Sequence, residues 1–162
     1  MTRYAVTGHM DLTDDSVALV REALREVFAA HTEGELVGVS CIAAGADSIF
    51  AEELLAAGGR LVVVLPSQDY RQAKVKPQHA AVFDHLVESA VEVVVMPHEN
   101  ANRQAYEAAN GELLRRGDRL VAVWDGTPPS GKGGGTADTV EQARAEGLAV
   151  DVVWPKGAAR RS

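Results

Sequence analysis

Cysteine is nearly missing from this sequence of 162 residues, and histidine is sparse. The single cysteine, Cys41, excludes an intramolecular disulfide and a cysteine-rich zinc site. It lies in the apolar run 36–44, which predicts a buried structural thiol rather than a reactive one. The five histidines show no metal-ligand spacing. We therefore expect no disulfide, no metal site and no thiol chemistry.

Long apolar runs and an excess of positive charge are missing as well. No segment approaches the roughly 18 apolar residues of a membrane span, and the opening MTRYAVTGHMD has no apolar stretch long enough for a signal peptide. The formal net charge is −7, whereas electrostatic binding of nucleic acid needs Lys and Arg to neutralise phosphates. We expect a cytoplasmic protein that binds neither a membrane nor a nucleic acid.

What the sequence does have is a regular alternation of two patterns. Segments of helical period, such as Val17, Val20, Leu24, Val27 and Phe28, separate short runs rich in β-branched residues. These runs predict six strands, at Tyr4–Thr7, Leu36–Ile42, Arg60–Leu65, Val91–Met96, Arg119–Trp124 and Ala149–Trp154. Alternation of strand and helix predicts a parallel sheet with right-handed crossovers.

Length and composition indicate one domain. Hydrophobic residues make up 46% and charged residues 24%, which is typical of globular proteins, and a chain of 162 residues can bury one full core. The expected fold class is a single α/β domain, doubly wound and Rossmann-like, with a mainly parallel six-stranded sheet and helices on both faces. We expect this domain to span 1–155 and the closing residues 156–162, KGAARRS, to form a flexible tail.

In an open α/β sheet, ligands bind outside the carboxyl ends of the strands, so the strand-to-helix loops are the places to search. Gly8 and His9 follow the first expected strand. Glycine lets the backbone approach a ligand and His9 can donate to a phosphate or base, although a tight turn with a solvated histidine is the alternative. Gly45 and Asp47 follow the second strand, and Asp47 either caps the next helix or accepts hydrogen bonds from a ribose.

Two further loops, 66–77 and 125–135, follow the third and fifth strands. In the first, Tyr70 suits a platform for a base and Arg71 suits a phosphate, with a solvated connector as the alternative. The second opens with Asp125, a candidate carboxylate, and Gly126. Both residues lie at the expected carboxyl edge and are candidate ligand contacts.

The glycine-rich part of the second loop is the most informative segment. Consecutive glycines present bare N–H groups to an anion, and the helix that follows adds its positive amino end. We predict a phosphate-binding loop rather than a flexible linker. The expected ligand contacts are Lys132, Gly133, Gly134, Gly135 and Thr136. The loop is not a Walker loop, because Lys132 precedes the glycines, and not the dinucleotide fingerprint, which follows the first strand.

Five segments together resemble one superfamily: TGHM, AAGAD, VVVLPS, RLVAVWDG and GKGGGTADTV. They resemble the SLOG group of Rossmann-like proteins, which includes the LOG cytokinin-activating phosphoribohydrolases, the molybdenum-cofactor carrier proteins and the DprA-like proteins. The resemblance covers nearly the whole chain and implies a nucleotide or nucleotide-derived ligand, with its phosphate on residues 133–136. It also implies a homodimer, which we expect to form through helix faces around Ala105, Ala108 and Ala109. We expect no cofactor.

In the hydrolase branch of that group, the loop reads PGGxGTxxE. The resemblance implies that its glutamate and an arginine on the preceding helix cleave the N-glycosidic bond of a nucleoside monophosphate. Here Thr139 stands in place of the glutamate, and the arginine's place falls near Ala109 and Asn110. The first hypothesis is therefore a binding or sensing module. The alternatives are a hydrolase acting on nucleoside 5′-monophosphates, with Asp138 as the catalytic candidate, and a partner-docking role.

Overall fold

The chain alternates strands and helices along its whole length, as the sequence predicts. The computed structural model describes residues 1–31, 34–131 and 135–162. Its strands are β1 (Thr2–Gly8), β2 (Leu36–Ser40), β3 (Arg60–Leu65), β4 (Glu92–Val95), β5 (Arg119–Val123) and β6 (Ala149–Val152). Its helices are α1 (Asp14–Ala29), α2 (Ala46–Ala56), α3 (Tyr70–Lys74), α4 (Pro77–Ser89), α5 (Arg103–Arg116) and α6 (Thr136–Ala145).

All six strands form one sheet in the order β4-β3-β2-β1-β5-β6, and every neighbouring pair is parallel. The order runs outward from β1 to β4 on one side and from β5 to β6 on the other. It therefore reverses between β1 and β5, where Tyr4 to Gly8 pair with Arg119 to Val123. This reversal confirms the expected doubly wound α/β fold.

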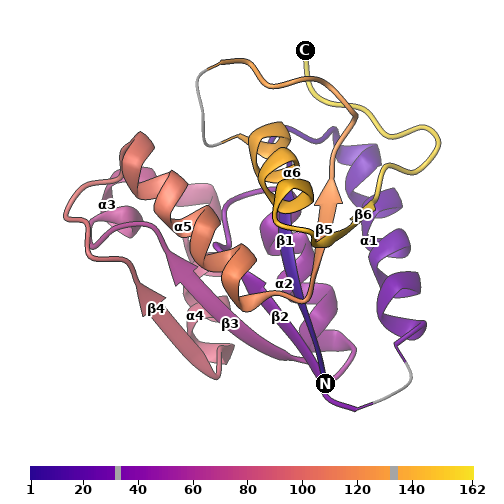
Figure 1. The fold of residues 1–162 in the computed structure, drawn as a ribbon, viewed down its shortest axis with the longest axis horizontal. Helices are drawn as coiled ribbons and strands as arrows, with labels where there is room; N and C mark the ends of the chain where they lie inside the picture. Colours follow the sequence, from indigo (N-terminus) through magenta and orange to yellow (C-terminus); the bar gives the residue numbers. More distant parts are fainter. Residues whose placement is uncertain (32–33, 132–134) are drawn as a thin grey trace.

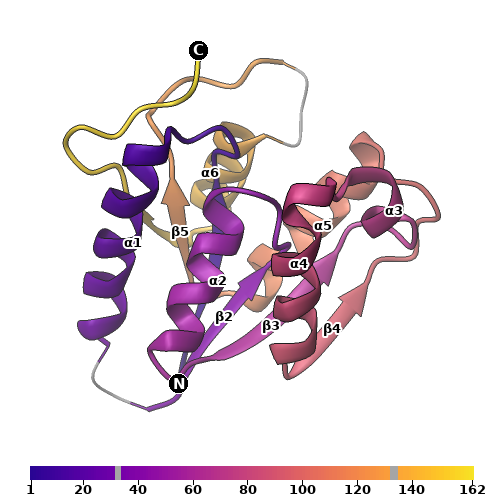
Figure 2. The same ribbon diagram turned by 180° about the vertical axis from the view of Figure 1, so that it is seen from behind.

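Two helical layers cover the two faces of the sheet (Figures 1 and 2). Helices α1, α2 and α4 pack on one face, where Leu24, Phe50 and Leu86 contribute to a buried cluster. Helices α5 and α6 lie on the other face, where Leu113 and Val140 belong to a second cluster. The apolar side chains of the central strands therefore point into both clusters, as expected for parallel strands buried on both faces.

The segment 66–77, expected as a loop, contains a short helix. Helix α3 begins at Tyr70, whose side chain is buried, and α4 begins at Pro77, a residue suited to the first helical turn. The second strand also ends earlier than expected, because the backbone of Ile42 turns into the left-handed region with φ +48°. This turn redirects the chain at the carboxyl end of β2.

The closing residues 156–162, expected as a flexible tail, lie against the loop before α1. The backbone N–H of Thr13 donates to the carbonyl of Ala159 (3.1 Å), and that of Arg161 donates to Asp11 (2.6 Å). The hydroxyl of Ser16, which is fully buried, donates to the Ala159 carbonyl and accepts from the Ala159 N–H (2.8 Å). The last residues are thus attached beside the carboxyl edge of β1.

Candidate functional site

The reversal of strand order gathers predicted site residues from distant parts of the sequence. Gly8 and His9 end β1, and Asp125 and Gly126 follow its neighbour β5. Such a reversal opens a crevice between the outgoing loops, and ligands of doubly wound folds bind there. We take this β1/β5 edge, with the adjoining start of α6, as the candidate site (Figure 1).

Glycines allow the backbone segments of this edge to approach closely. A Cβ on Gly8 would clash with the Cβ of Ala46 and lie 2.8 Å from that of Val123. Gly45 has φ +85°, and a Cβ there would lie 2.7 Å from the carbonyl oxygen of His9. That carbonyl accepts the N–H of Ala46 at the start of α2 (3.1 Å). Both predicted glycines therefore serve the packing of the edge.

His9 and Asp125 form a direct pair across the β1/β5 edge. The Nε2 of His9 lies 3.0 Å from the Oδ1 of Asp125, and the imidazole is buried with its ring edge-on to Trp154. Burial alone would raise the pKa of Asp125, but hydrogen bonds from the hydroxyl and N–H of Thr127, together with His9, lower it to about 2. The β1/β5 edge therefore holds the negatively charged carboxylate of Asp125, which contacts the imidazole of His9.

The closing segment adds a residue that the sequence patterns do not reveal. Arg160 donates to the carboxylate of Asp11 (2.9 Å), and its guanidinium lies 3.8 Å from the carboxylate of Asp125. Arg160 is separated from Asp11 by most of the chain and carries no motif, so only the fold brings the two together. It places a cation beside the His9–Asp125 pair.

Asp47 lies on the same edge, one strand further along, at the start of α2. Burial raises the pKa of its carboxyl group to about 7, against a hydrogen bond from the backbone of Ala43. Because no ion pair compensates this burial among the described residues, the carboxyl group exists in both protonation states near neutral pH. It can therefore donate to or accept from a ligand.

The structure does not bring Tyr70 and Arg71 to the crevice. Tyr70 is buried against Phe83, and Arg71 forms a bidentate ion pair with Asp84 of α4 (2.7 and 2.8 Å). The aromatic ring next to Tyr70 that is partly exposed is that of Tyr106, which contacts the Tyr70 ring edge-on at a centroid distance of 6.5 Å. The sequence reasoning missed Tyr106, because it lies inside a helical pattern rather than in a loop.

Tyr106 reaches across the carboxyl end of the sheet. It belongs to the first turn of α5, yet its ring packs against the cluster on the opposite face of the sheet. Burial raises the pKa of its hydroxyl, and the nearby Asp69 and Cys41 act in the same direction. Its ring is therefore positioned beside the ends of β2 and β3, where Cys41 and Asp69 follow these strands.

Cys41 itself is buried, as predicted. Burial raises the pKa of its thiol well above the usual range, with a smaller contribution from Asp47. A neutral, buried thiol is a poor nucleophile.

The described end of the glycine-rich loop begins α6. Residues 132–134, which include the predicted contacts Lys132, Gly133 and Gly134, lie outside the described residues. Gly135 precedes the helix, and its N–H donates to the carboxylate of Asp138 (3.1 Å). The next residues, Thr136 and Ala137, open the helix. Asp138 thus acts as a helix cap in the structure.

Thr139, in place of the glutamate, and Ala109, one of the two residues near the arginine's place, are both buried. Thr139 is 1% exposed, and its hydroxyl donates to the carbonyl of Gly135 (3.0 Å). Ala109 is 1% exposed and packs against the sheet. Neither side chain is available to a ligand.

Most of the helix face expected for dimer formation is buried as well. Ala105 and Ala109 are almost inaccessible, because α5 uses its small residues to approach the sheet. Ala108, the third residue of the expected face, is only partly buried. Ala105 and Ala109 are therefore not available to a second copy, and the homodimer itself stays a prediction.

Two other structural features bear on function. No group of three or more His, Cys, Asp or Glu in the described ranges is arranged to hold a metal ion. None of the helices in those ranges is long and apolar enough to cross a membrane.

No protein-family model and no curated protein matches the sequence, whereas solved structures do match. DNA processing protein A from Streptococcus pneumoniae matches with a TM-score of 0.71 and 18% identity over 97% of this chain and 52% of that protein. The Helicobacter pylori protein, described by its single-stranded DNA binding mode, matches with a TM-score of 0.69 and 16% identity over 98% of this chain and 68% of that one. The Chlamydomonas reinhardtii molybdenum-cofactor carrier protein matches with a TM-score of 0.54 and 17% identity over 93% of this chain and 74% of that one.

These are two of the three kinds of protein that the sequence resemblance names. The chain has the fold of the SLOG group. The resemblance is therefore confirmed at the level of the SLOG fold, and the chain spans about half of the length of the Streptococcus pneumoniae protein. At 16–18% identity this likeness shows the fold alone, so the function has to be argued from the site.

Proposed function

We propose that the chain binds a nucleotide or nucleotide-derived small molecule at the β1/β5 edge, as a binding or sensing module. The observation that carries this proposal is the reversal of strand order between β1 and β5. The reversal coincides with a buried His9–Asp125 pair and with a glycine-rich loop that leads from β5 into α6. A helix that starts at such an edge attracts a phosphate through its free N–H groups and positive amino end.

A nucleoside phosphate fits the spacing of the polar groups along this edge. We propose that its phosphate binds at residues 131–136, at the start of α6. The ends of β2 and β3 lie two and three strand spacings from β5, or roughly 10 and 14 Å away. Asp47 and Tyr106 lie there, as a hydrogen-bonding group for a ribose and a ring for a base. Arg160 supplies a further cation beside the crevice.

The hypothesis of a hydrolase that cleaves the N-glycosidic bond has less support than the hypothesis of a binding module. An oxocarbenium-like transition state needs a nearby free carboxylate. Thr139 replaces the glutamate of the hydrolase branch and is buried, and Asp138 is bonded to the N–H of Gly135. We therefore expect binding with little or no release of base. A homodimer and a small-molecule partner remain part of the proposal.

A substitution at Gly135 tests the phosphate position without removing the helix. Aspartate and serine are both favourable residues before the first turn of a helix. Among the residues that the structure describes, a Cβ on Gly135 meets only Asp138 within 4 Å, at 3.6 Å. Gly135→Asp places a negative charge where the phosphate is proposed to bind, whereas Gly135→Ser is neutral. Both variants should fold, and only Gly135→Asp should lose affinity, by at least about tenfold.

Isothermal titration calorimetry with a panel of nucleoside mono-, di- and triphosphates provides the readout. Equal affinities of the two variants would contradict the proposed phosphate position, and no binding of any panel member to the natural chain would contradict the ligand class. Chromatography of the same mixtures detects free base. Turnover of about 1 per second or faster would favour the hydrolase instead.

A further inference from the structure

Exposed apolar side chains concentrate on one strand. Six large hydrophobic residues are exposed among those that the structure describes, and three of them lie in or beside β4: Val91 (61%), Val93 (40%) and Val95 (48%). Single exposed apolar residues are ordinary, whereas a contiguous group marks an interaction surface. We call these three residues the β4 valines.

Strand β4 is also an edge of the sheet. Only β3 pairs with it in the described sheet, and both ribbon views show its outer side uncovered by a helix (Figures 1 and 2). An edge strand exposes unpaired N–H and C=O groups, which natural proteins usually protect with lysine, proline or a covering segment. Within β4, EVVV, the only charged residue is Glu92.

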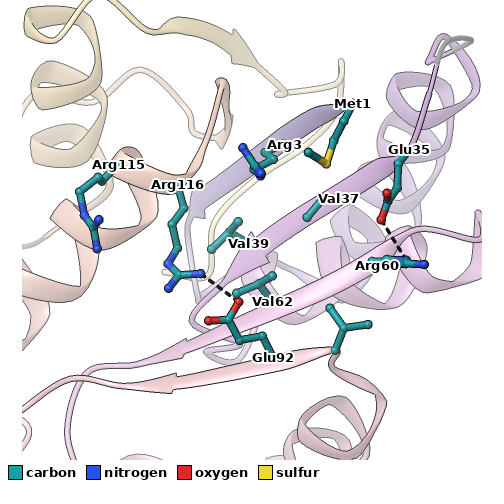
Figure 3. A pocket seen from close by; sticks show the side chains of 11 residues that line it. Met1, Arg3, Glu35, Val37, Val39, Arg60, Val62, Glu92, Arg115 and Arg116 are labelled. Carbon is teal, nitrogen blue, oxygen red and sulfur yellow. Dashed lines mark hydrogen bonds and ion pairs between the residues drawn. The ribbon is translucent and has the colours of Figure 1, made fainter.

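That single charge is already neutralised from inside the same chain. The guanidinium of Arg116 on α5 lies 3.2 Å from the carboxylate of Glu92, at the rim of a shallow hollow (Figure 3). The hollow has a volume of about 400 Å³ and lies on the α5 face, toward the amino ends of the strands. Its floor of Val37, Val39 and Val62 is buried. Val91 also lines this hollow, whereas Val93 and Val95 lie outside it and are exposed on β4 itself.

We propose that two copies of this chain associate through antiparallel pairing of their β4 strands. The two six-stranded sheets would then continue into each other around a two-fold axis perpendicular to the sheet. This inference does not depend on the proposed ligand. It places the dimer interface on the exposed β4 edge instead of on the buried alanines of α5.

The sequence of β4 is self-complementary in this arrangement. Antiparallel pairing about such an axis places side chains of the same face opposite each other, so Val93 meets Val93 or Val95 of the second copy. In both registers Glu92 lies opposite an apolar residue. A register centred on Glu92 is disfavoured, because it would place two carboxylates opposite each other. The surface thus fits a second copy of itself.

The oligomeric state of the natural chain and two lysine variants tests the proposal. Val93→Lys places a charge at the centre of the proposed interface. Val152→Lys is the matched control, because Val152 is equally an exposed valine (48%) on an edge strand, β6, at the opposite side of the sheet. Val95→Lys repeats the test at a second position if Val93→Lys does not fold.

Size-exclusion chromatography with light scattering at micromolar concentration should give twice the monomer mass for the natural chain and for Val152→Lys. Val93→Lys should give the monomer mass, and circular dichroism should show it folded. A monomeric natural chain would overturn the proposal. It would equally be overturned if Val93→Lys and Val95→Lys stayed dimeric, or if Val152→Lys alone dissociated the dimer.

Discussion

Asp47 and Asp125 lie on the same edge of the sheet, yet their surroundings act on them in opposite ways. The carboxylate of Asp125 accepts hydrogen bonds from Thr127 and contacts His9, so its pKa falls to about 2. The carboxyl group of Asp47 is buried with only a backbone hydrogen bond from Ala43, so its pKa rises to about 7. The sequence identifies both residues by position. Their charge states depend on neighbours that come together only in the fold.

The raised pKa of Asp47 gives stability a definite pH dependence. The folded chain holds the Asp47 proton more tightly than the unfolded chain, whose aspartate has a pKa of about 3.9. Stability from this group is therefore present at low pH and is lost as pH rises from about 4 to about 7. Asp47→Asn removes this loss. It should stabilise the chain at pH 8 by about 1–2 kcal/mol, after allowance for partial exposure, and much less at pH 4.

Thermal unfolding of Asp47→Asn and the natural chain at the two pH values measures this difference. Asp138→Asn, whose carboxylate is more accessible and bonded to an N–H, is the comparison variant. A difference of the same size at both pH values would show that the burial of Asp47 does not control its protonation.

Tyr106 is expected to contribute binding energy through its ring rather than its hydroxyl. A base stacked on an aromatic side chain contributes about 1–3 kcal/mol, so Tyr106→Ala should weaken the binding of a nucleoside phosphate by about 5- to 150-fold. Tyr106→Phe keeps the ring and should bind within about twofold of the natural chain. Titration calorimetry with the tightest ligand of the panel measures both. Equal losses for Phe and Ala would assign the effect to the hydroxyl group.

Among the elements, the helices followed the sequence signals closely and the loops did not. Thr13 caps α1 by accepting the N–H of Ser16, and Gly58 and Gly147 follow α2 and α6 with positive φ. These signals are local, so a single sequence reveals them. The contacts of Arg160 and Tyr106 join distant segments or depend on which helix face is buried, and no local pattern encodes them.

The attachment of residues 156–162 should depend on one buried hydroxyl. Ser16 bonds Ala159 twice and also contacts the Thr13 hydroxyl (2.6 Å), so Ser16→Ala removes both side-chain hydrogen bonds to Ala159 and leaves the Thr13 N–H as the donor to the Ala159 carbonyl. We expect a loss of about 1–3 kcal/mol in the free energy of unfolding. Arg160→Ala removes a largely exposed ion pair and should cost less than about 1 kcal/mol.

Urea unfolding measures these losses, and limited trypsin digestion monitors the segment itself. Cleavage after Lys156 should be slow in the natural chain and in Arg160→Ala, and faster in Ser16→Ala. Rapid cleavage of the natural chain would instead support the flexible tail that the sequence predicts.

The overall charge of the molecule does not suit the binding of nucleic acid, which needs unpaired positive side chains. The net charge is −7, and most arginines of the described chain already form ion pairs: Arg21, Arg25, Arg60, Arg71, Arg103, Arg115, Arg116, Arg119, Arg160 and Arg161. Few cations are left to neutralise phosphates along a strand. The fold was predictable from the sequence because it depends on repeated apolar runs, whereas charge pairing across elements was not.

We therefore expect no saturable binding of single-stranded DNA at physiological salt, although the Helicobacter pylori protein of the same fold is described as binding it. Fluorescence anisotropy with a labelled oligonucleotide measures this, with that protein as the positive control. Micromolar affinity that weakens steeply with added salt would contradict the prediction.

The attachment of residues 156–162 beside the crevice also matters for how the protein is handled. Both the loop after β5 and the last residue lie at the carboxyl edge of the sheet, while Met1 lies at its other end (Figure 1). A purification tag or fluorescent reporter joined after Ser162 would therefore start next to the proposed ligand, where it can report on binding or obstruct it. One joined before Met1 would start at the far end of the strands, so assays of the unobstructed site should carry their tag there.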